Sequence, residues 1–384
     1  MAARPRRTVW CKALRLACWN AVGVRGGKLE LEHFLSLHGV DICLLIETFL
    51  KADQAFRLAN YVCHGTDRPT AVGGTANMVR RGIVHHSVLV SGLTHLEDTA
   101  IQVILVGRPV KILAVYLFPS RPLIGEDLTA CFGGGLPVRM AGDLNAKHVE
   151  WNSRLITRRG KFLRDYADEN SCLIFGPDTP TTKPYNCSAI PYVLDIPIVK
   201  DLPFPLYLTS CSALSTNHLP VLIDKTCRSS FQRPPDRPDF RSTDWANFQT
   251  HLEDQILFDP ELHNGMAIDT CVENFSGAVL KALAVSTRKC RPRDDSRPPI
   301  TVGIQDEIRL KVRLSRQWHF TKDPTLKAEF NRLQMSVTRR LNEWRNDKGS
   351  TTLESLDPED QSLWRMTKQV KRVPTPSPPW SPLG

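Results

Sequence analysis

The chain has 384 residues, of which 41% are hydrophobic and 23% charged, so its composition is that of a globular protein rather than of a disordered chain. Its net charge of +10 favours an anionic partner, although charge alone does not separate nucleic acid from a membrane surface. The eleven cysteines form no Cys-x-x-Cys pair, which argues against a zinc site and a disulfide scaffold. No stretch of about 18 apolar residues occurs, which argues against a membrane partner. Together these features predict an intracellular protein.

Short apolar runs separated by polar turns predict a series of β-strands through the first 224 residues. These runs lie at residues 14–19, 42–46, 100–106, 110–117, 137–141, 172–175, 192–199 and 220–223. Helical spacing of apolar residues occurs between them at residues 28–37 and 160–170. Many strands with few crossover helices favour an α/β fold of two packed sheets flanked by helices over a doubly wound parallel sheet.

The second half of the chain has a helical and basic pattern. A segment rich in proline and arginine at residues 231–239 predicts a linker, and helical patterns follow at 243–257, 268–285 and 304–344. Residues 288–348 hold sixteen Lys and Arg against eight Asp and Glu. We therefore expect a domain at 12–228, a linker at 229–242, a helical basic connector at 243–372 and an extended proline-rich tail at 373–384.

Polar side chains suited to phosphodiester hydrolysis stand at the ends of the predicted strands or inside them. This reaction needs a divalent cation, a base that activates water, and donors that stabilise the developing charge. Asp143 and Asn145 are two apart and would project the same way from an extended segment, although an Asx turn uses the same residue types. Asp195 lies inside an apolar run, where an unpaired carboxylate is costly. Asn20, Glu47 and His218 each have an ordinary alternative explanation, as a turn residue, a solvated strand end or a surface histidine.

The order and spacing of these residues are more specific than any one of them. They resemble the active-site series of the endonuclease/exonuclease/phosphatase superfamily, which here comprises Asn20, Glu47, Tyr116, Asp143, Asn145, Asp195 and His218. Over residues 12–224 the surrounding motifs are similar to those of the endonucleases of non-LTR retrotransposons, the jockey group in particular. These motifs are Gly73-Gly74-Thr75-Ala76, Val115-Tyr116-Leu117-Phe118-Pro119-Ser120, Gly142-Asp143-Leu144-Asn145-Ala146-Lys147-His148, Val193-Leu194-Asp195-Ile196 and His218-Leu219-Pro220-Val221.

The resemblance implies a four-layer αββα sandwich of the DNase I type, and a basic connector like the one that precedes the reverse transcriptase in such polyproteins. No Tyr-x-Asp-Asp motif occurs, so the polymerase part is expected to be missing. The implied reaction is metal-dependent nicking of target DNA, which leaves a 3′-hydroxyl to prime reverse transcription. The implied partners are DNA and the element's RNA, with action in the nucleus, and the oligomeric state is left open.

The same resemblance implies how the metal and the water are held. Glu47 would ligate Mg²⁺ or Mn²⁺ with help from Asn20, because carboxylate and amide oxygens are ligands that these cations accept. Asp143 would orient or deprotonate the attacking water, and Asn145 would hold the water and the phosphate.

It also implies donors to the scissile phosphate. Tyr116 and His218 would donate as charge develops, and Asp195 would fix the histidine or a neighbouring group. The family has an aspartate before this histidine, whereas this chain has Asn217, which keeps the shape of the side chain and loses its charge. We therefore expect Asn217 to lower the activity, on the hypothesis that a carboxylate at this position would hold the imidazole.

Two further positions depart from the pattern. Phe49 stands where jockey-type sequences usually have a histidine, and Val22 stands where a polar residue is common after the Trp-Asn pair. These departures leave two alternatives open. One is a catalytically dead remnant that only binds nucleic acid, and the other is a phosphatase of the same superfamily, since the metal chemistry is shared.

Overall fold

The computed structural model describes residues 9–51, 56–65, 72–105, 107–184, 189–202, 206–232, 237–240, 242–255, 265–290, 300–357 and 362–371. The predicted proline-rich tail lies outside these residues. The chain forms two compact units, of which the first comprises Met1–Gln232 with Arg297–Gly384 and the second comprises Arg233–Ser296. This division differs from the linear succession of domain, linker and connector that the sequence predicts. No helix in the described ranges combines the length and apolar character that a membrane span requires.

The first unit contains two six-stranded mixed sheets. One has the strand order β11-β12-β1-β2-β4-β3, and the other has the order β5-β6-β7-β8-β10-β9. The strands of the first sheet are β1 (Val9–Asn20), β2 (Ile42–Ile46), β3 (Tyr61–Gly65), β4 (Thr75–Arg80), β11 (Leu206–Ser210) and β12 (Val221–Gln232). Those of the second are β5 (His85–Val88), β6 (Leu96–Leu105), β7 (Arg108–Leu117), β8 (Val138–Asp143), β9 (Cys172–Ile174) and β10 (Asp195–Lys200).

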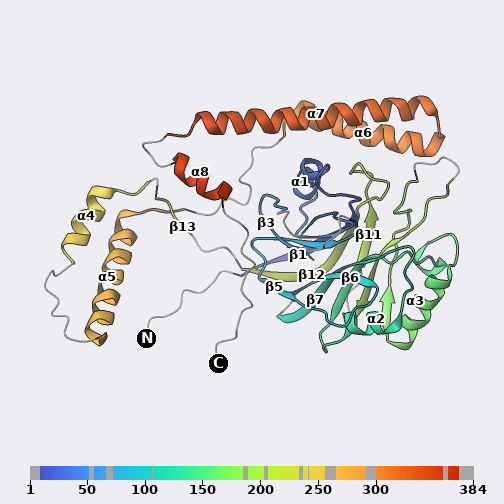
Figure 1. The fold of residues 1–384 in the computed structure, drawn as a ribbon, viewed down its shortest axis with the longest axis horizontal. Coiled ribbons are helices and arrows are strands. Elements are labelled where there is room, and N and C mark those ends of the chain that lie inside the picture. The colour runs from blue at the N-terminus through green and yellow to red at the C-terminus, as the bar shows by residue number, and fades with distance from the viewer. Residues whose placement is uncertain are drawn as a thin grey trace. The chain divides into compact units, whose positions relative to one another are not determined.

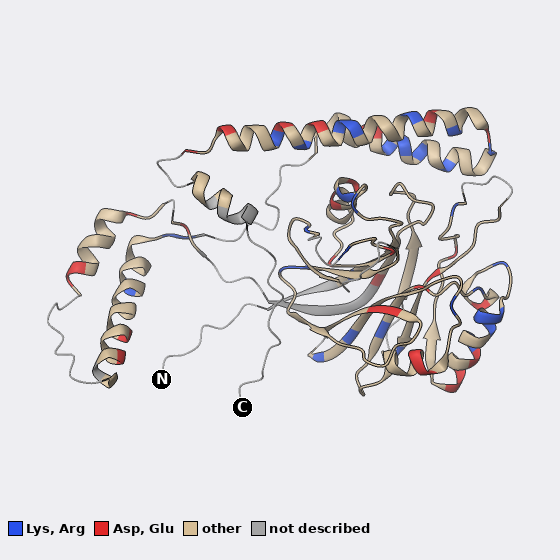
Figure 2. Cartoon of the chain, viewed as in Figure 1, with Lys and Arg blue, Asp and Glu red and all other residues tan. Residues whose placement is uncertain are grey.

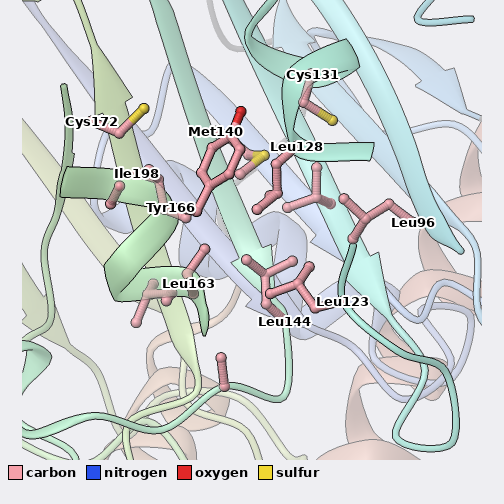
Figure 3. Packing of buried hydrophobic residues seen from close by; sticks show 14 of the residues in the cluster. Leu96, Leu123, Leu128, Cys131, Met140, Leu144, Leu163, Tyr166, Cys172 and Ile198 are labelled. Atoms are coloured by element: carbon pink, nitrogen blue, oxygen red, sulfur yellow. The ribbon is translucent and has the colours of Figure 1, made fainter. Parts of the chain in front are cut away.

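Alternating side chains of the central strands build separate apolar layers. On β1, Leu16 faces the core between the sheets, while the adjacent Ala17 faces the core under α1 (Lys28–Leu37). On β7, Ile112 belongs to the core between the sheets, and Leu113 faces the core under α2 (Gly125–Phe132) and α3 (Arg158–Glu169). Figure 3 shows this last core, in which Leu128 of α2 and Leu163 of α3 surround Met140 of β8. Helix, sheet, sheet and helix therefore follow one another, which confirms the predicted αββα sandwich (Figure 1).

The predicted amphipathic stretch at 304–344 forms two antiparallel helices. They are α6 (Val302–Thr321) and α7 (Pro324–Glu354). Lys322 ends α6 with a left-handed φ of 60°, and the Asp323 side chain caps α7 by accepting from the Thr325 N–H at 2.8 Å. Pro324 suits the first helical turn, where its missing N–H is not needed. The predicted apolar stripe packs inside this hairpin, with Val337 and Leu341 buried against Ile304 and Ile308.

The α6–α7 hairpin is joined to the sandwich by a buried ion pair. Lys311 of α6, 2% exposed, donates to Glu30 of α1, 6% exposed, at 2.7 Å. The Ser215 hydroxyl lies within hydrogen-bond distance of Glu30 and of the Gln334 side-chain oxygen of α7, and its one proton can be donated to either. Leu29 of α1 adds an apolar contact to the hairpin core. A segment that the sequence predicts to be a connector thus contributes to the same compact unit as the sandwich.

The second unit is small and helical. It contains α4 (Trp245–Glu253) and α5 (Gly265–Ser286), and the short strands β13 (Arg237–Pro238) and β14 (Lys289–Cys290) pair antiparallel. The helix α8 (Ser362–Lys371) belongs to the first unit. The 3₁₀ turn η1 (Val149–Trp151) precedes α3.

Candidate active site

Polar residues from both sheets meet at one end of the sandwich. β1 and β2 run parallel, so Asn20 and the residue after Ile46, which is Glu47, lie at the same edge of the first sheet. β7 and β8 are also parallel, and Tyr116 lies beside Asp143 at the corresponding edge of the second sheet. The sequence pattern therefore reflects strand ends that converge in space.

Gly142 allows β7 and β8 to approach closely next to this edge. A Cβ atom at position 142 would lie 1.8 Å from the carbonyl oxygen of Val115, a distance that no side chain tolerates. The absence of a side chain at this position therefore fixes Asp143 beside Tyr116.

Asn20 connects the carboxylates of the two sheets. Its fully buried amide nitrogen donates to Glu47 Oε1 at 2.8 Å and to Asp143 Oδ2 at 3.3 Å. Its oxygen accepts from the Val22 N–H at 3.3 Å. The two carboxylates thus lie within reach of one amide group, well inside the separation of about 10 Å that a shared site requires. Of the two chemical roles open to Asn20, ligating a cation or orienting carboxylates, this geometry fits the second.

Asp143 and Asp195 are directly opposed across the antiparallel pair of β8 and β10. Their carboxylates and His218 bring ligand atoms within 4.8 Å of one another, and all three residues are buried. Burial, followed by the charge of Asp195, raises the pKa of Asp143 to about 6. Like charges that face each other in a buried sheet repel, so this arrangement favours a bound cation.

Asp195 also orients His218. Its Oδ2 lies 3.0 Å from Nδ1 of the imidazole, while its other oxygen, Oδ1, is buried without a hydrogen-bond partner among the described residues. Burial lowers the pKa of His218, but the charge and hydrogen bond of Asp195, with the charges of Asp143 and Glu47, outweigh burial and raise it to about 9. The ring is therefore a cation near neutral pH, with Nε2 left to donate to a substrate.

The loop before His218 is tied to the core of the sandwich. Trp19 Nε1 donates to Thr216 Oγ1 at 3.0 Å and to the His218 carbonyl at 3.3 Å, and the Thr216 hydroxyl donates to the Asn20 carbonyl at 3.3 Å. The Asn217 carbonyl accepts from the Lys183 N–H at 2.6 Å. The expectation that the residue at 217 holds the imidazole is corrected here, because the Nδ1 partner is Asp195. The carboxylate expected at 217 is supplied from β10.

Tyr116 is set up as a hydrogen-bond donor. Burial, the charge of Glu47 and a hydrogen bond to Glu47 raise the pKa of the phenol well above its usual value, so it stays protonated. β6 and β7 place Glu97 directly across from Tyr116, and the charge of Glu97 also raises the pKa of the phenol.

Asn145 is positioned differently from the expectation. β8 ends at Asp143, and Asn145 adopts a left-handed φ of 50°, so the strand alternation that would align the two side chains has ended. The Asx turn forms instead, with the Asn145 N–H donating to Asp143 Oδ1 at 2.9 Å. The Asn145 side chain donates to the Leu117 carbonyl at 2.9 Å, next to Tyr116. Asn145 therefore stays at the site, held by β7.

The backbone around Glu47 is strained. Glu47 has a φ of 49°, and the two positions that depart from the family pattern, Val22 and Phe49, have φ values of 42° and 53°. Left-handed backbone is uncommon for residues with a side chain and is tolerated better by Asn, Asp and His than by β-branched residues. Val22 and Phe49 thus add strain beside the site without contributing a polar group to it.

Sequence reasoning missed two residues at the site. Glu97 accepts from the Gly74 N–H at 2.6 Å and so joins β6 to the glycine motif before β4. The sequence could have indicated Glu97 if the strand predicted from residue 100 were extended to residue 96, because that strand then places Glu97 opposite Tyr116. Lys147 lies near Asp143, and its ammonium stands 3.5 Å from the ring centre of Tyr192. Lys147 lies in the motif at residues 142–148 that carries the family resemblance, but no spacing rule indicates that its side chain belongs to the site.

Comparison with protein families and with known relatives agrees with this geometry. Residues 18–264 match the endonuclease/exonuclease/phosphatase family. A probable RNA-directed DNA polymerase from transposon BS of Drosophila melanogaster is 28% identical over 375 residues, which are 94% of this chain and 41% of the relative. The RNA-directed DNA polymerase from mobile element jockey of Drosophila funebris is 27% identical over 377 residues, or 95% of this chain and 41% of the relative. The chain thus spans about two fifths of the length of these relatives.

Solved structures with similar folds include nucleases. The endonuclease domain of TRAS1, a telomere-specific non-LTR retrotransposon, aligns with 56% of this chain and 98% of its own, at 15% identity and a TM-score of 0.47. The catalytic domain of Xenopus laevis APE2 aligns with 58% of this chain and 94% of its own, at 14% identity and a TM-score of 0.43.

Proposed function

Since the chain belongs to the endonuclease/exonuclease/phosphatase family, we propose that it is a divalent-cation-dependent phosphodiesterase that nicks DNA for retrotransposition. The observation that carries this proposal is the buried cluster of Asp143, Asp195 and His218, in which one carboxylate oxygen of Asp195 has no described partner. A buried unpaired carboxylate oxygen is costly unless a cation or another donor reaches it.

The residues present fit a hard cation such as Mg²⁺ or Mn²⁺. Glu47, Asp143 and the unpaired oxygen of Asp195 are the carboxylate ligands that the site offers, and Asn20 holds the first two in place. When bound, the cation would neutralise the phosphate and lower the pKa of an attacking water. His218 is left for the substrate, because its Nδ1 is occupied by Asp195.

The protein groups then divide the remaining work. Asp143 can accept a proton from the attacking water when it is ionised. The imidazolium of His218 and the phenol of Tyr116 can donate hydrogen bonds to phosphate oxygens as negative charge develops. Asn145 keeps the Asp143 carboxylate oriented through its N–H.

DNA is the substrate that the surroundings favour. The α6–α7 hairpin carries many Lys and Arg beside the sandwich (Figure 2), and such groups bind a phosphate backbone without reading its sequence. The polymerase names of the relatives support a place for this chain in retrotransposition. We propose the element's RNA as a further partner and the nucleus as the place of action. A phosphatase of the same family is the alternative with the same chemistry.

A remnant that only binds nucleic acid is the other alternative. The cluster itself argues against it, because Asn20 still bridges Glu47 and Asp143 and Asp195 still holds His218. Catalysis lost through Asn217 would require a contact with the imidazole that Asp195 already makes.

The experiment is a plasmid-nicking assay with the full chain. Conversion of supercoiled plasmid to open circles should require Mg²⁺ or Mn²⁺, stop with EDTA, and be lost in Asp143→Asn. Release of phosphate from inositol phosphates, assayed in parallel, should be absent. If the folded wild-type protein does not nick, or if it hydrolyses inositol phosphates instead, the proposal is rejected.

A further inference from the structure

A groove separate from the active site lies in the first unit, between α1 and α6. The segment at 211–213 closes one side of it, and its volume is about 420 Å³. We call it the α1–α6 groove. The apolar part of its lining, here called the floor, comprises Leu37 of α1, Ala213 and Val312 of α6, together with Phe34 and Ile308, which are themselves buried.

One wall of the α1–α6 groove is a row of arginines. Arg309, Arg313 and Arg316 all line it, and their spacing of four and three residues places them on one face of α6. At 1.5 Å per residue the row is about 10 Å long. Arg309 forms an exposed pair with Asp306 at 2.8 Å, while Arg313 and Arg316 form no ion pair within the described part of the chain.

Among the described residues that line the groove, no free negative charge compensates this row. Glu30 is the acidic residue of the lining, and it is already bound by Lys311 at 2.7 Å. The opposite wall carries His33 and His38. Burial, followed by the charges of Arg309 for His33 and Arg15 for His38, lowers the pKa of each imidazole, so both are neutral at physiological pH.

We propose that the α1–α6 groove binds a single strand of DNA, with its phosphates on Arg313 and Arg316 and its bases against the apolar floor. The inference rests on the proposed function, because the bound strand would be part of the DNA that the active site cleaves. A ligand for this groove needs anionic groups along one side and flat apolar faces on the other. A single strand offers both, whereas a duplex keeps its base faces stacked inside.

Imidazole and guanidinium groups in the groove favour bases over an acidic peptide. His38 lines the groove and is partly exposed, and its ring lies against that of the buried Phe34, with the centroids 4.6 Å apart. Neutral imidazoles and the planar guanidinium of arginine both stack on bases. An acidic peptide would use the same charges but not these flat surfaces.

The groove and the catalytic histidine also share one loop. Residues 211–213 line the groove, and the same segment continues through Ser215, which contacts α6 and α7, to His218. The proposal therefore places the strand along this loop, between the active site and the groove. The arginine row would hold the strand beside the point of cleavage.

The test measures binding of a fluorescent oligodeoxythymidine of about 20 nucleotides, longer than the site of a single-strand-binding module. Anisotropy is recorded with the full chain in EDTA, so that no cleavage occurs. Arg313→Glu/Arg316→Glu should weaken binding at least about tenfold and reduce the salt slope by about 0.7 for each phosphate that the variant no longer neutralises. The matched control, Arg332→Glu/Arg345→Glu on exposed positions of α7, changes the net charge equally and should weaken binding less than about threefold.

A second pair of variants tests the apolar floor without changing charge. Leu37, 67% exposed, can be changed to serine without disturbing the core, and Leu89, 90% exposed and next to β5 of the other sheet, is its control. Leu37→Ser should weaken binding of the oligonucleotide several-fold, while Leu89→Ser should leave it unchanged. Circular dichroism of each variant confirms folding.

Defined outcomes overturn the proposal. Equal weakening by the two arginine pairs would mean that net charge alone attracts DNA. Equal affinity for duplex of the same length, with no effect of Leu37→Ser, would exclude base contacts, and equal displacement by oligoglutamate would assign the groove to acidic peptides. Wild-type protein that binds through the groove but does not nick plasmid would refute the proposed function alone. If the wild-type protein nicks plasmid but Arg313→Glu/Arg316→Glu binds the oligonucleotide as tightly as the wild type, this inference alone is refuted.

Discussion

Two of the places where the first unit buries ionisable side chains are the strand ends around Asp143 and the junction of α1 with α6 around Lys311. At the junction, Lys311 and Glu30 neutralise each other at 2.7 Å, and Ser215 satisfies further hydrogen bonds. At the strand ends, Asp143 faces Asp195, and an oxygen of Asp195 has no described partner. The junction balances its own charge and the strand ends do not.

This difference separates a structural from a functional use of buried charge. In a balanced pair, the attraction between the two charges offsets the free-energy cost of taking them out of water. The pair then favours the one arrangement of the chain in which both partners meet. An excess of carboxylates leaves a free-energy cost that a cation from outside removes while the carboxylates stay ionised. We therefore expect changes at the junction to alter stability and changes at the strand ends to alter catalysis.

Removal of the catalytic imidazole should have the largest effect. His218→Ala should lower the rate of plasmid nicking by about 10² to 10⁴, the contribution expected of a positioned proton or hydrogen-bond donor. Because the variant leaves the Asp195 carboxylate buried without its partner, stability should fall as well, so the nicking rate is compared per folded molecule at low temperature. Retention of more than a tenth of the wild-type nicking rate would show that His218 does not act on the phosphate.

Removal of the junction cation should reverse this pattern. Lys311→Met leaves the Glu30 carboxylate buried without its partner and should lower the free energy of unfolding by roughly 3–5 kcal/mol. Urea denaturation measures this change, and nicking per folded molecule should change little at low temperature. Lys311→Met/Glu30→Leu serves as the control, because replacing both charges by apolar groups should recover most of the stability. If the single variant is as stable as the wild type, the ion pair does not join the hairpin to the sandwich.

A charge restored at position 217 should have the smallest effect. Asn217→Asp should change nicking by less than about threefold, a barrier difference below about 1 kcal/mol. The reason is that Asp195 already holds Nδ1 of His218. A gain of tenfold or more, absent when His218→Ala is combined with it, would restore the hypothesis that a carboxylate at 217 acts through the imidazole.

Much of the fold could be predicted because its strands are apolar and buried. The run at 42–46 matches β2 residue for residue, since every side chain in it is buried. The apolar pattern does not indicate the strands β4 (Thr75–Arg80) and β5 (His85–Val88), because polar side chains there form hydrogen bonds between the two sheets or face outward. Asn77, for example, is fully buried and donates to the Thr99 carbonyl. No rule of apolar alternation detects such a strand.

The candidate site was predictable as a set of residues and not as a set of contacts. Family resemblance identified its members and already implied Asp195 as a partner of the histidine or of a neighbouring group, but local spacing could not show that this contact excludes Asn217, because it depends on how the two sheets face each other. The contact between Lys311 and Glu30 joins residues 281 positions apart, so no local pattern indicates that part of the predicted connector belongs to the same compact unit as the sandwich. Long-range packing decides both features.

The most direct test compares Asp143→Asn with Glu30→Gln in urea denaturation, each with EDTA and with Mg²⁺. Both variants remove one buried carboxylate, and the balance of charge predicts opposite signs. Without metal, Asp143→Asn should raise the free energy of unfolding by about 1 kcal/mol, because it relieves repulsion from Asp195, and it should lose the stabilisation that Mg²⁺ gives the wild type. Glu30→Gln should lower it by at least about 2 kcal/mol and keep the Mg²⁺ effect, because it leaves Lys311 buried and unpaired. If both variants are destabilised alike without metal, and Mg²⁺ does not stabilise the wild type, the carboxylates at the strand ends are not a cation site and the account fails.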